Sequence, residues 1–171
     1  MINMLAPQHQ GKVTRTEAIL HYKTQKPEKA YIWEALQVAG SGHNMIGGRN
    51  VPVGNKHLAL QGDAVMPVIM IERWYNQGGA LVDWDSVRQH HLSDGNLARV
   101  AIATGLTAEI NCNPRQIVQP SVKMAANLLE ALIGAAWLDS DGDMEAIKTV
   151  MIALGFGDVV DPADPEPQNQ A

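Results

Sequence analysis

The chain has 171 residues, and 46% of them are hydrophobic, which suits one globular domain with a buried core and excludes a disordered chain. Its formal net charge of −5 excludes a strongly basic nucleic-acid-binding surface, although a local basic patch remains compatible with it. The single cysteine, Cys112, excludes a disulfide within the chain and favours an intracellular location, either cytoplasmic or mitochondrial. No stretch predicts a secretory leader or a membrane span, so we expect no membrane partner.

Helical periodicity is present along most of the chain and strand alternation is absent, which predicts an all-α fold. We expect helices over residues 13–22, 26–39, 56–76, 83–92, 94–106, 121–138 and 141–157. The expected N-caps of four of them are Thr14 or Thr16, Asn55, Asp83 and Ser121. Residues 40–54 are rich in glycine and predict a loop whose role the sequence leaves open.

The composition divides the chain into three parts. Residues 1–13 predict a flexible N-terminal segment, and residues 14–157 predict a single domain. Residues 158–171 are rich in proline and acidic residues, which is typical of a disordered tail.

Two segments carry a family resemblance. "GNKHLALQGDAVM" resembles the signature helix of the ribonuclease III domain, and "VKMAANLLEALIGAAWLDS" resembles that family's later acidic helix. "HYKTQKPEKAYIWEALQVAGSG" and "LSDGNLARVAIATGL" are similar to its opening helix pair and its middle helix, in the same order. The resemblance covers most of the chain, from Thr14 to Gly155, and suggests a small stand-alone domain of the kind found in fungi and in mitochondrial ribosomes, among other places.

The resemblance implies a ribonuclease III endonuclease-domain helical fold that acts on double-stranded or structured RNA as a homodimer. It places the signature helices at the dimer interface, where we expect the apolar contact to come from Leu58, Leu60, Val65 and Met66. Duplex RNA would lie across the joint cleft and be recognised by its shape and its phosphates.

The family's chemistry uses four carboxylates, two from each of the two matched helices, to hold Mg²⁺. Asp63 and Glu130 match two of them, whereas Ala59 and Asn127 stand where the family has Glu and Asp. Lys56 occupies a position that often holds another glutamate. The candidate catalytic residues are therefore Asp63, Glu130, Lys123, Asn127, His57 and Lys56, and the candidate metal ligands are Asp63 and Glu130.

The two replacements weaken any metal site. Two Mg²⁺ ions about 4 Å apart repel each other by about 4 kcal/mol even in water, and two carboxylates offset that repulsion poorly. Asn127 offers only a neutral carbonyl oxygen and Ala59 offers no ligand. We therefore expect one weakly held Mg²⁺ or none, and metal-dependent RNA cleavage that is impaired or lost.

Three alternatives stay open, so the sequence does not decide whether the protein is an enzyme. An active Mg²⁺-dependent endoribonuclease would use one metal ion or a shifted ligand set, to which Glu34, Glu72 or Glu109 could supply oxygen, although nothing in the sequence places them near Asp63. A dimeric scaffold within a ribonucleoprotein needs no chemistry at all. A recruited fold would use the mixed acids and bases for acid–base catalysis on a small molecule. Structural pairing of Glu130 with Lys123 or Lys56 is the simplest non-functional interpretation of that buried acid.

Overall fold

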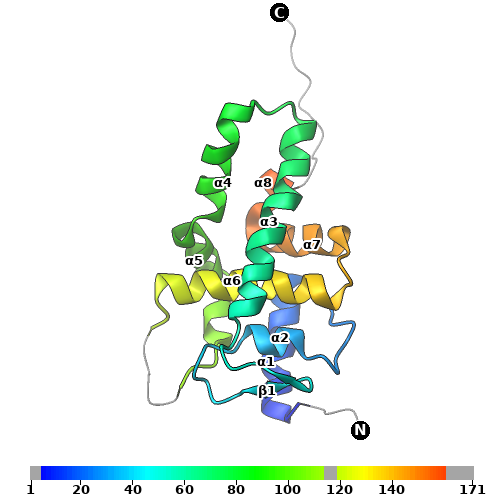
Figure 1. The fold of residues 1–171 in the computed structure, drawn as a ribbon, viewed down its shortest axis with the longest axis vertical. Helices are drawn as coiled ribbons and strands as arrows, with labels where there is room; N and C mark the ends of the chain where they lie inside the picture. Colours follow the sequence, from blue (N-terminus) through cyan, green and yellow to red (C-terminus); the bar gives the residue numbers. More distant parts are fainter. Residues whose placement is uncertain (1–4, 114–118, 161–171) are drawn as a thin grey trace, which may run out of the picture.

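Helix α6 (Val122–Asp139) runs through the middle of the molecule, and the other elements pack around it (Figure 1). Helix α3 (Lys56–Asn76) crosses it on one side and α5 (Asp94–Ala103) packs beside its first half. The computed structural model describes residues 5–113 and 119–160. The remaining elements are α1 (Pro7–Leu20), α2 (Tyr31–Ala35), β1 (Met45–Ile46), β2 (Arg49–Asn50), α4 (Trp84–Leu92), α7 (Met144–Met151) and α8 (Gly157–Val160), with 3₁₀ turns at Leu81–Asp83 and Leu106–Glu109 and a π-helical turn at Ile152–Phe156.

The long central helices agree with the sequence prediction. The bounds of α3 are those predicted, and the Ser121 hydroxyl caps α6 by accepting a hydrogen bond from the Met124 amide at 3.2 Å. The predicted capping by Asn55 and Asp83 is wrong, since neither side chain accepts a bond from its helix. The buried Asn55 side chain instead donates to the carbonyl of Ala35 at 2.9 Å and so ties the start of α3 to α2.

The first two helices differ from their predicted bounds. Helix α1 begins at Pro7, so half of it lies in the segment expected to be flexible, and Thr16 is a buried mid-helix residue rather than a cap. Pro7 suits the first helical position, but the polar residues after it gave no apolar periodicity to detect. Helix α2 is far shorter than residues 26–39, because Ala30 has a left-handed backbone (φ 53°) at its start.

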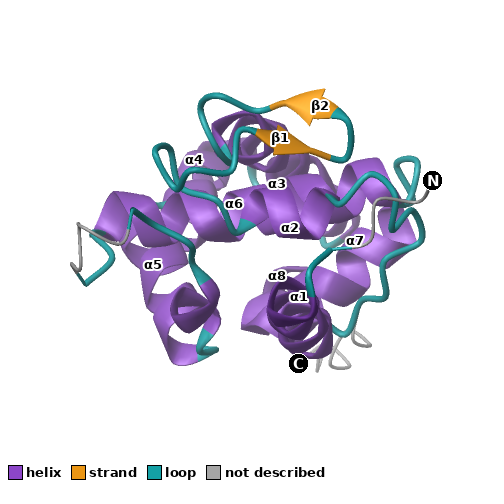
Figure 2. Cartoon of the chain, turned by 90° about the horizontal axis from the view of Figure 1, so that it is seen from below, coloured by secondary structure: helices purple, strands orange, loops and turns teal. Residues whose placement is uncertain are grey.

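The glycine-rich loop and the last helix also depart from prediction. Residues 45–50 form a small antiparallel hairpin that the sequence did not indicate, and it lies on the outer side of the helices (Figure 2). The predicted helix over residues 141–157 is interrupted after Met151 by a π-helical turn, since Gly155 has a φ of 90°. Helix α8 covers residues 157–160, and the rest of the predicted tail lies outside the described residues.

No helix within the described ranges is long and apolar enough to cross a membrane.

Candidate functional site

Two glycines bring α3 and α6 into near contact. A Cβ atom added at Gly62 would lie 1.9 Å from the carbonyl oxygen of Glu130, and one added at Gly134 would lie 2.1 Å from the carbonyl oxygen of Leu58. Only glycine allows backbones to approach this closely. Asp63 follows Gly62 directly, and at this crossing Asp63 and Glu130 line the same hollow and interact electrostatically.

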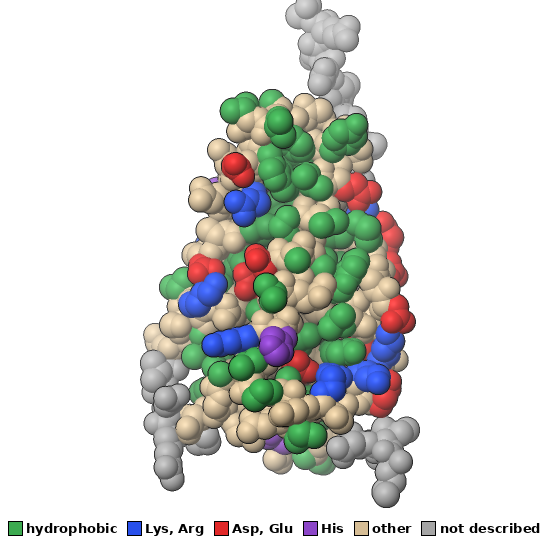
Figure 3. Space-filling view, in the orientation of Figure 1, with side chains coloured by type: hydrophobic (Ala, Val, Ile, Leu, Met, Phe, Trp, Pro, Cys, Tyr) green, Lys and Arg blue, Asp and Glu red, His purple; other side chains and the backbone are tan. Residues whose placement is uncertain are grey.

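The crossing forms the wall of an open hollow of about 320 Å³. It is lined by Lys56, Ala59, Leu60, Asp63, Leu92, Asp94, Lys123, Asn127 and Glu130. On α3 the lining residues are spaced three and four apart, as they are on α6, so each helix presents one face to the hollow. Acidic and basic side chains lie close together over this part of the molecule (Figure 3).

The hollow collects five of the six candidate catalytic residues chosen from the sequence: Lys56, Asp63, Lys123, Asn127 and Glu130. The sixth, His57, is exposed and does not line it. Asp94, the first residue of α5, also lines the hollow and was not among the residues predicted from the sequence. Its only signal was its place in the "LSDGNLARVAIATGL" segment, which predicted a helix there but no acid at the site.

Lys123 and Asp94 form an ion pair across the hollow, with Nζ 3.0 Å from Oδ1. This hydrogen bond, with further attraction from Glu130 and Asp63, raises the pKa of Lys123 above its ordinary value. Lys123, one of the two lysines expected to pair with Glu130, therefore attracts Glu130 electrostatically. Its hydrogen bond goes to Asp94 instead.

Glu130 is buried, with 7% of its surface exposed. Burial raises its pKa to about 7 from the ordinary value of 4.5; Lys123 opposes this effect, and the carboxylates of Asp63 and Asp94 add to it. Glu130 therefore exchanges a proton near neutral pH.

The residues of the hollow do not fit a pair of Mg²⁺ ions. Ala59 and Asn127 line it at the positions where the matched family has acids, and the Asp94 carboxylate is engaged by the Lys123 ammonium. Among residues 5–113 and 119–160, no group of three or more His, Cys, Asp or Glu side chains is arranged to hold a metal ion.

The acids considered for a shifted ligand set lie elsewhere. Glu34 pairs with Arg49, Glu72 with Lys148, and Glu109 with Arg15. None of the three acids lines the hollow, so the structure contradicts that shifted set.

The residues expected at a dimer interface are mostly in the core. Leu58, Val65 and Met66 are buried on the face of α3 turned toward the protein interior, and only Leu60 is exposed. An exposed stripe runs along the outer face of α3 instead. It consists of Leu60, Ala64, Val68, Ile71 and Tyr75, spaced three and four residues apart.

Comparison with known proteins supports the fold. No protein-family model and no curated protein matches the sequence. One similar solved structure is the nuclease domain of ribonuclease III from Campylobacter jejuni, described for structural flexibility in the region involved in dimer formation. Its TM-score is 0.69 at 21% sequence identity, and the match covers 86% of this chain and 97% of that chain. A second structure of the same nuclease domain gives 0.66 at 20% identity and covers 82% and 92%. The chain therefore has the all-α fold of a ribonuclease III nuclease domain, as the sequence predicted.

Proposed function

We propose that this protein engages double-stranded or structured RNA at the hollow between α3, α5 and α6, and that metal-dependent cleavage there is much reduced or lost. The observation that carries the proposal is the composition of this hollow. It keeps Asp63, Glu130 and two lysines, while Ala59 and Asn127 stand at the positions of two metal-binding acids.

The open shape of the hollow and the two lysines at its edge suit contact with a phosphate backbone. Lys56 and Lys123 are exposed at its edge, where their ammonium groups can contact phosphate oxygens. The hollow is open and polar, which fits a duplex recognised by shape better than an enclosed small molecule. This favours RNA engagement over small-molecule catalysis.

We also propose that the protein works as a symmetric homodimer through the exposed stripe of α3. Apolar side chains gather over this helix on one face of the molecule (Figure 3). Tyr75 is 77% exposed and Val68 is 52% exposed, and Leu81 and Val82, in the 3₁₀ turn that follows α3 in the chain, are also largely exposed. A self-complementary stripe of this kind suits a two-fold contact. A dimer that binds no RNA would favour the scaffold alternative.

RNA engagement is tested by measuring binding of duplex RNA over a range of KCl concentrations. We expect affinity to fall steeply with salt, and Lys56→Gln to lower the slope of log affinity against log salt by about one. Lys29→Gln removes an exposed lysine outside the hollow and should leave the slope unchanged. Binding that is absent at low salt, or unaffected by Lys56→Gln, contradicts the proposal.

Loss of cleavage is tested by restoring the missing acids. The wild-type protein should leave duplex RNA intact in Mg²⁺, whereas Ala59→Glu combined with Asn127→Asp should bind Mn²⁺ more tightly and recover measurable cleavage. Efficient Mg²⁺-dependent cutting by the wild type, abolished by Asp63→Ala, would overturn this part of the proposal.

A further inference from the structure

A second cavity lies between α1, the loop that follows it, and α2. Its volume is about 160 Å³, and it shares no lining residue with the hollow at Glu130. Most of its wall is apolar and comes from Val13, Pro27, Ala30, Ile32 and Trp33. An apolar cavity of about 150 Å³ accepts one benzene molecule, so this cavity has room for one small ring or a branched aliphatic group.

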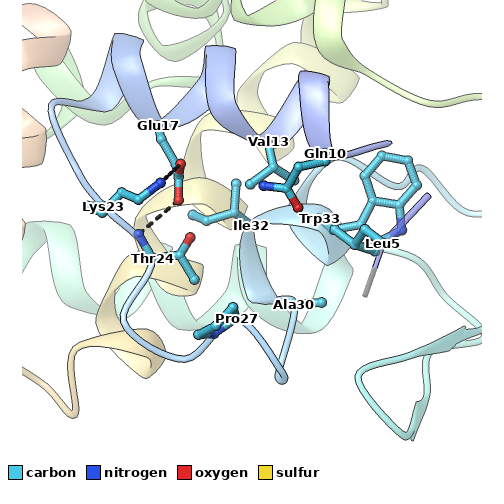
Figure 4. Close-up of a pocket in the computed structure, with 10 residues that line it drawn as sticks. All are labelled: Leu5, Gln10, Val13, Glu17, Lys23, Thr24, Pro27, Ala30, Ile32 and Trp33. Atoms are coloured by element: carbon cyan, nitrogen blue, oxygen red, sulfur yellow. Dashed lines mark hydrogen bonds and ion pairs between the residues drawn. The ribbon is translucent and has the colours of Figure 1, made fainter. Parts of the chain in front are cut away.

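One end of this cavity is polar. Figure 4 shows Glu17, Lys23 and Thr24 together at that end, with Trp33 and Leu5 at the other. One Glu17 carboxylate oxygen accepts a hydrogen bond from the Thr24 amide at 2.9 Å, and the other accepts from Lys23 Nζ at 2.9 Å. A carboxylate oxygen can accept a second bond, so both keep capacity for a ligand.

Thr24 lies at the same end of the cavity, and its Oγ1 is buried beside the Glu17 carboxylate. The Thr24 hydroxyl is a donor toward that carboxylate and helps to lower the pKa of Glu17, so the acceptors left for a ligand are the Glu17 oxygens.

The polar end of the cavity holds an ion pair whose buried member is the negative one, Glu17. Burial acts to raise the pKa of Glu17, but the hydrogen bonds from Thr24 and Lys23 outweigh it and the pKa is lowered, so the carboxylate is ionised at neutral pH. Only 6% of the Glu17 side chain is exposed, whereas 82% of the Lys23 side chain is. An ion pair with so exposed a partner is weak, and an incoming cation can displace it.

We propose that this cavity binds a small amphipathic primary amine. The ammonium group has three donors and no acceptor, and it meets the two Glu17 oxygens, each of which can accept a second hydrogen bond. The apolar part of the ligand fills the space between α1 and α2. An alcohol of the same size supplies one donor and no charge, and a carboxylate is repelled by Glu17.

The test is a set of titrations at pH 7 with benzylamine, benzyl alcohol and benzoate, followed by amide chemical shifts. We expect saturable binding of benzylamine with shifts around Glu17, Thr24 and Ile32, at least tenfold weaker binding of benzyl alcohol, and no binding of benzoate. Benzoate binding as well as benzylamine, or no saturable binding of benzylamine, would overturn the proposal.

Two substitutions should act in opposite directions. Glu17→Gln removes the charge and should weaken benzylamine binding at least tenfold without changing the affinity for benzyl alcohol. Lys23→Met removes the competing ammonium group and should tighten benzylamine binding severalfold. If the Glu17–Lys23 pair only holds the loop in place, both substitutions should weaken binding of both compounds, and that result rejects the proposal.

A blocking variant keeps the test independent of loop stability. Gln10 is exposed on α1 and lines the cavity, so Gln10→Trp should cover it and abolish binding of benzylamine. Gln8 is exposed on the same helix but does not line the cavity, and Gln8→Trp should bind as the wild type does. Unchanged binding by Gln10→Trp would show that the amine binds elsewhere.

Discussion

At the scale of single residues, Glu130 links the candidate site to the stability of the fold. Its pKa of about 7 lies above the ordinary value of 4.5 because it is buried. The native state therefore holds this proton more tightly than the unfolded chain does. The stability that the neutral acid contributes is fully present below pH 4.5 and is lost as the pH rises through 7.

We expect Glu130→Gln to abolish this dependence. The variant should match the wild type at pH 4.5 and be more stable at pH 8, by at most about 3 kcal/mol. Urea unfolding of both proteins at the two pH values, at one protein concentration and in EDTA, measures the difference. Equal stability of the two proteins at pH 8 would show that burial does not penalise the charged form.

The residues of the site were predictable where a family resemblance covers them. Asp63 and Glu130 could be placed on facing helices because the two segments resemble the two acidic helices of the ribonuclease III domain, and the structure brings them to one hollow. Asp94 and its bond to Lys123 were not predictable, because they depend on how α5 packs against α6. His57 was chosen for its nearness in sequence, which on a helix places it on a different face from Lys56.

At the scale of helices, the close crossing of α3 and α6 holds the site together. We expect Gly62→Ala to lower the free energy of unfolding by about 3 kcal/mol or more, because its Cβ would meet the Glu130 carbonyl oxygen at 1.9 Å. Chemical denaturation measures this change.

A matched control is available in α1. Gly11 has ordinary space for a Cβ, whose nearest neighbour would be Arg15 Nη1 at 3.5 Å. Gly11→Ala should be neutral or stabilise the protein by up to about 1 kcal/mol, since alanine favours the helix. If both substitutions have the same effect, the close approach of the two helices is not what makes Gly62 necessary.

Helix bounds were predictable where local signals decide them and not where distant contacts do. Helix α6 begins at a serine cap and carries a continuous apolar pattern, so its start was clear. Helix α2 is short because the chain before it is held elsewhere: the buried Asp139 carboxylate accepts hydrogen bonds from the amides of Gln25 and Lys26. The bond from Tyr22 to the same carboxylate completes a contact between residues more than a hundred positions apart. Such a tertiary contact overrides helix propensity and leaves no mark in the local sequence.

At the scale of the whole molecule, α3 contributes both to the proposed RNA-binding hollow and to the proposed dimer contact. Its inner face carries Leu58, Val65 and Met66 into the core, its polar face supplies Asp63 to the hollow, and its outer face carries the exposed stripe. The sequence shows apolar residues on nearly every side of this helix, so periodicity alone did not separate the core from the dimer contact. Packing against α6 decides which face is buried, and the remaining apolar face is available to a second copy.

This arrangement makes the proposed dimer sensitive to a single substitution in the stripe. Val68→Lys places one charge on each protomer of a two-fold interface, so the penalty is counted twice. If each buried lysine charge weakens association by about 2 kcal/mol, the two charges together should lower the dimer association constant roughly a thousandfold. Sedimentation equilibrium measures that fall, and duplex RNA binding should weaken with it. Ile102 is 61% exposed on α5 and lies outside the stripe, so Ile102→Lys should leave both the dimer and RNA binding intact. A monomeric wild-type protein would show that there is no dimer contact. An equal loss of dimer association in Val68→Lys and Ile102→Lys would show that the contact does not lie on the stripe.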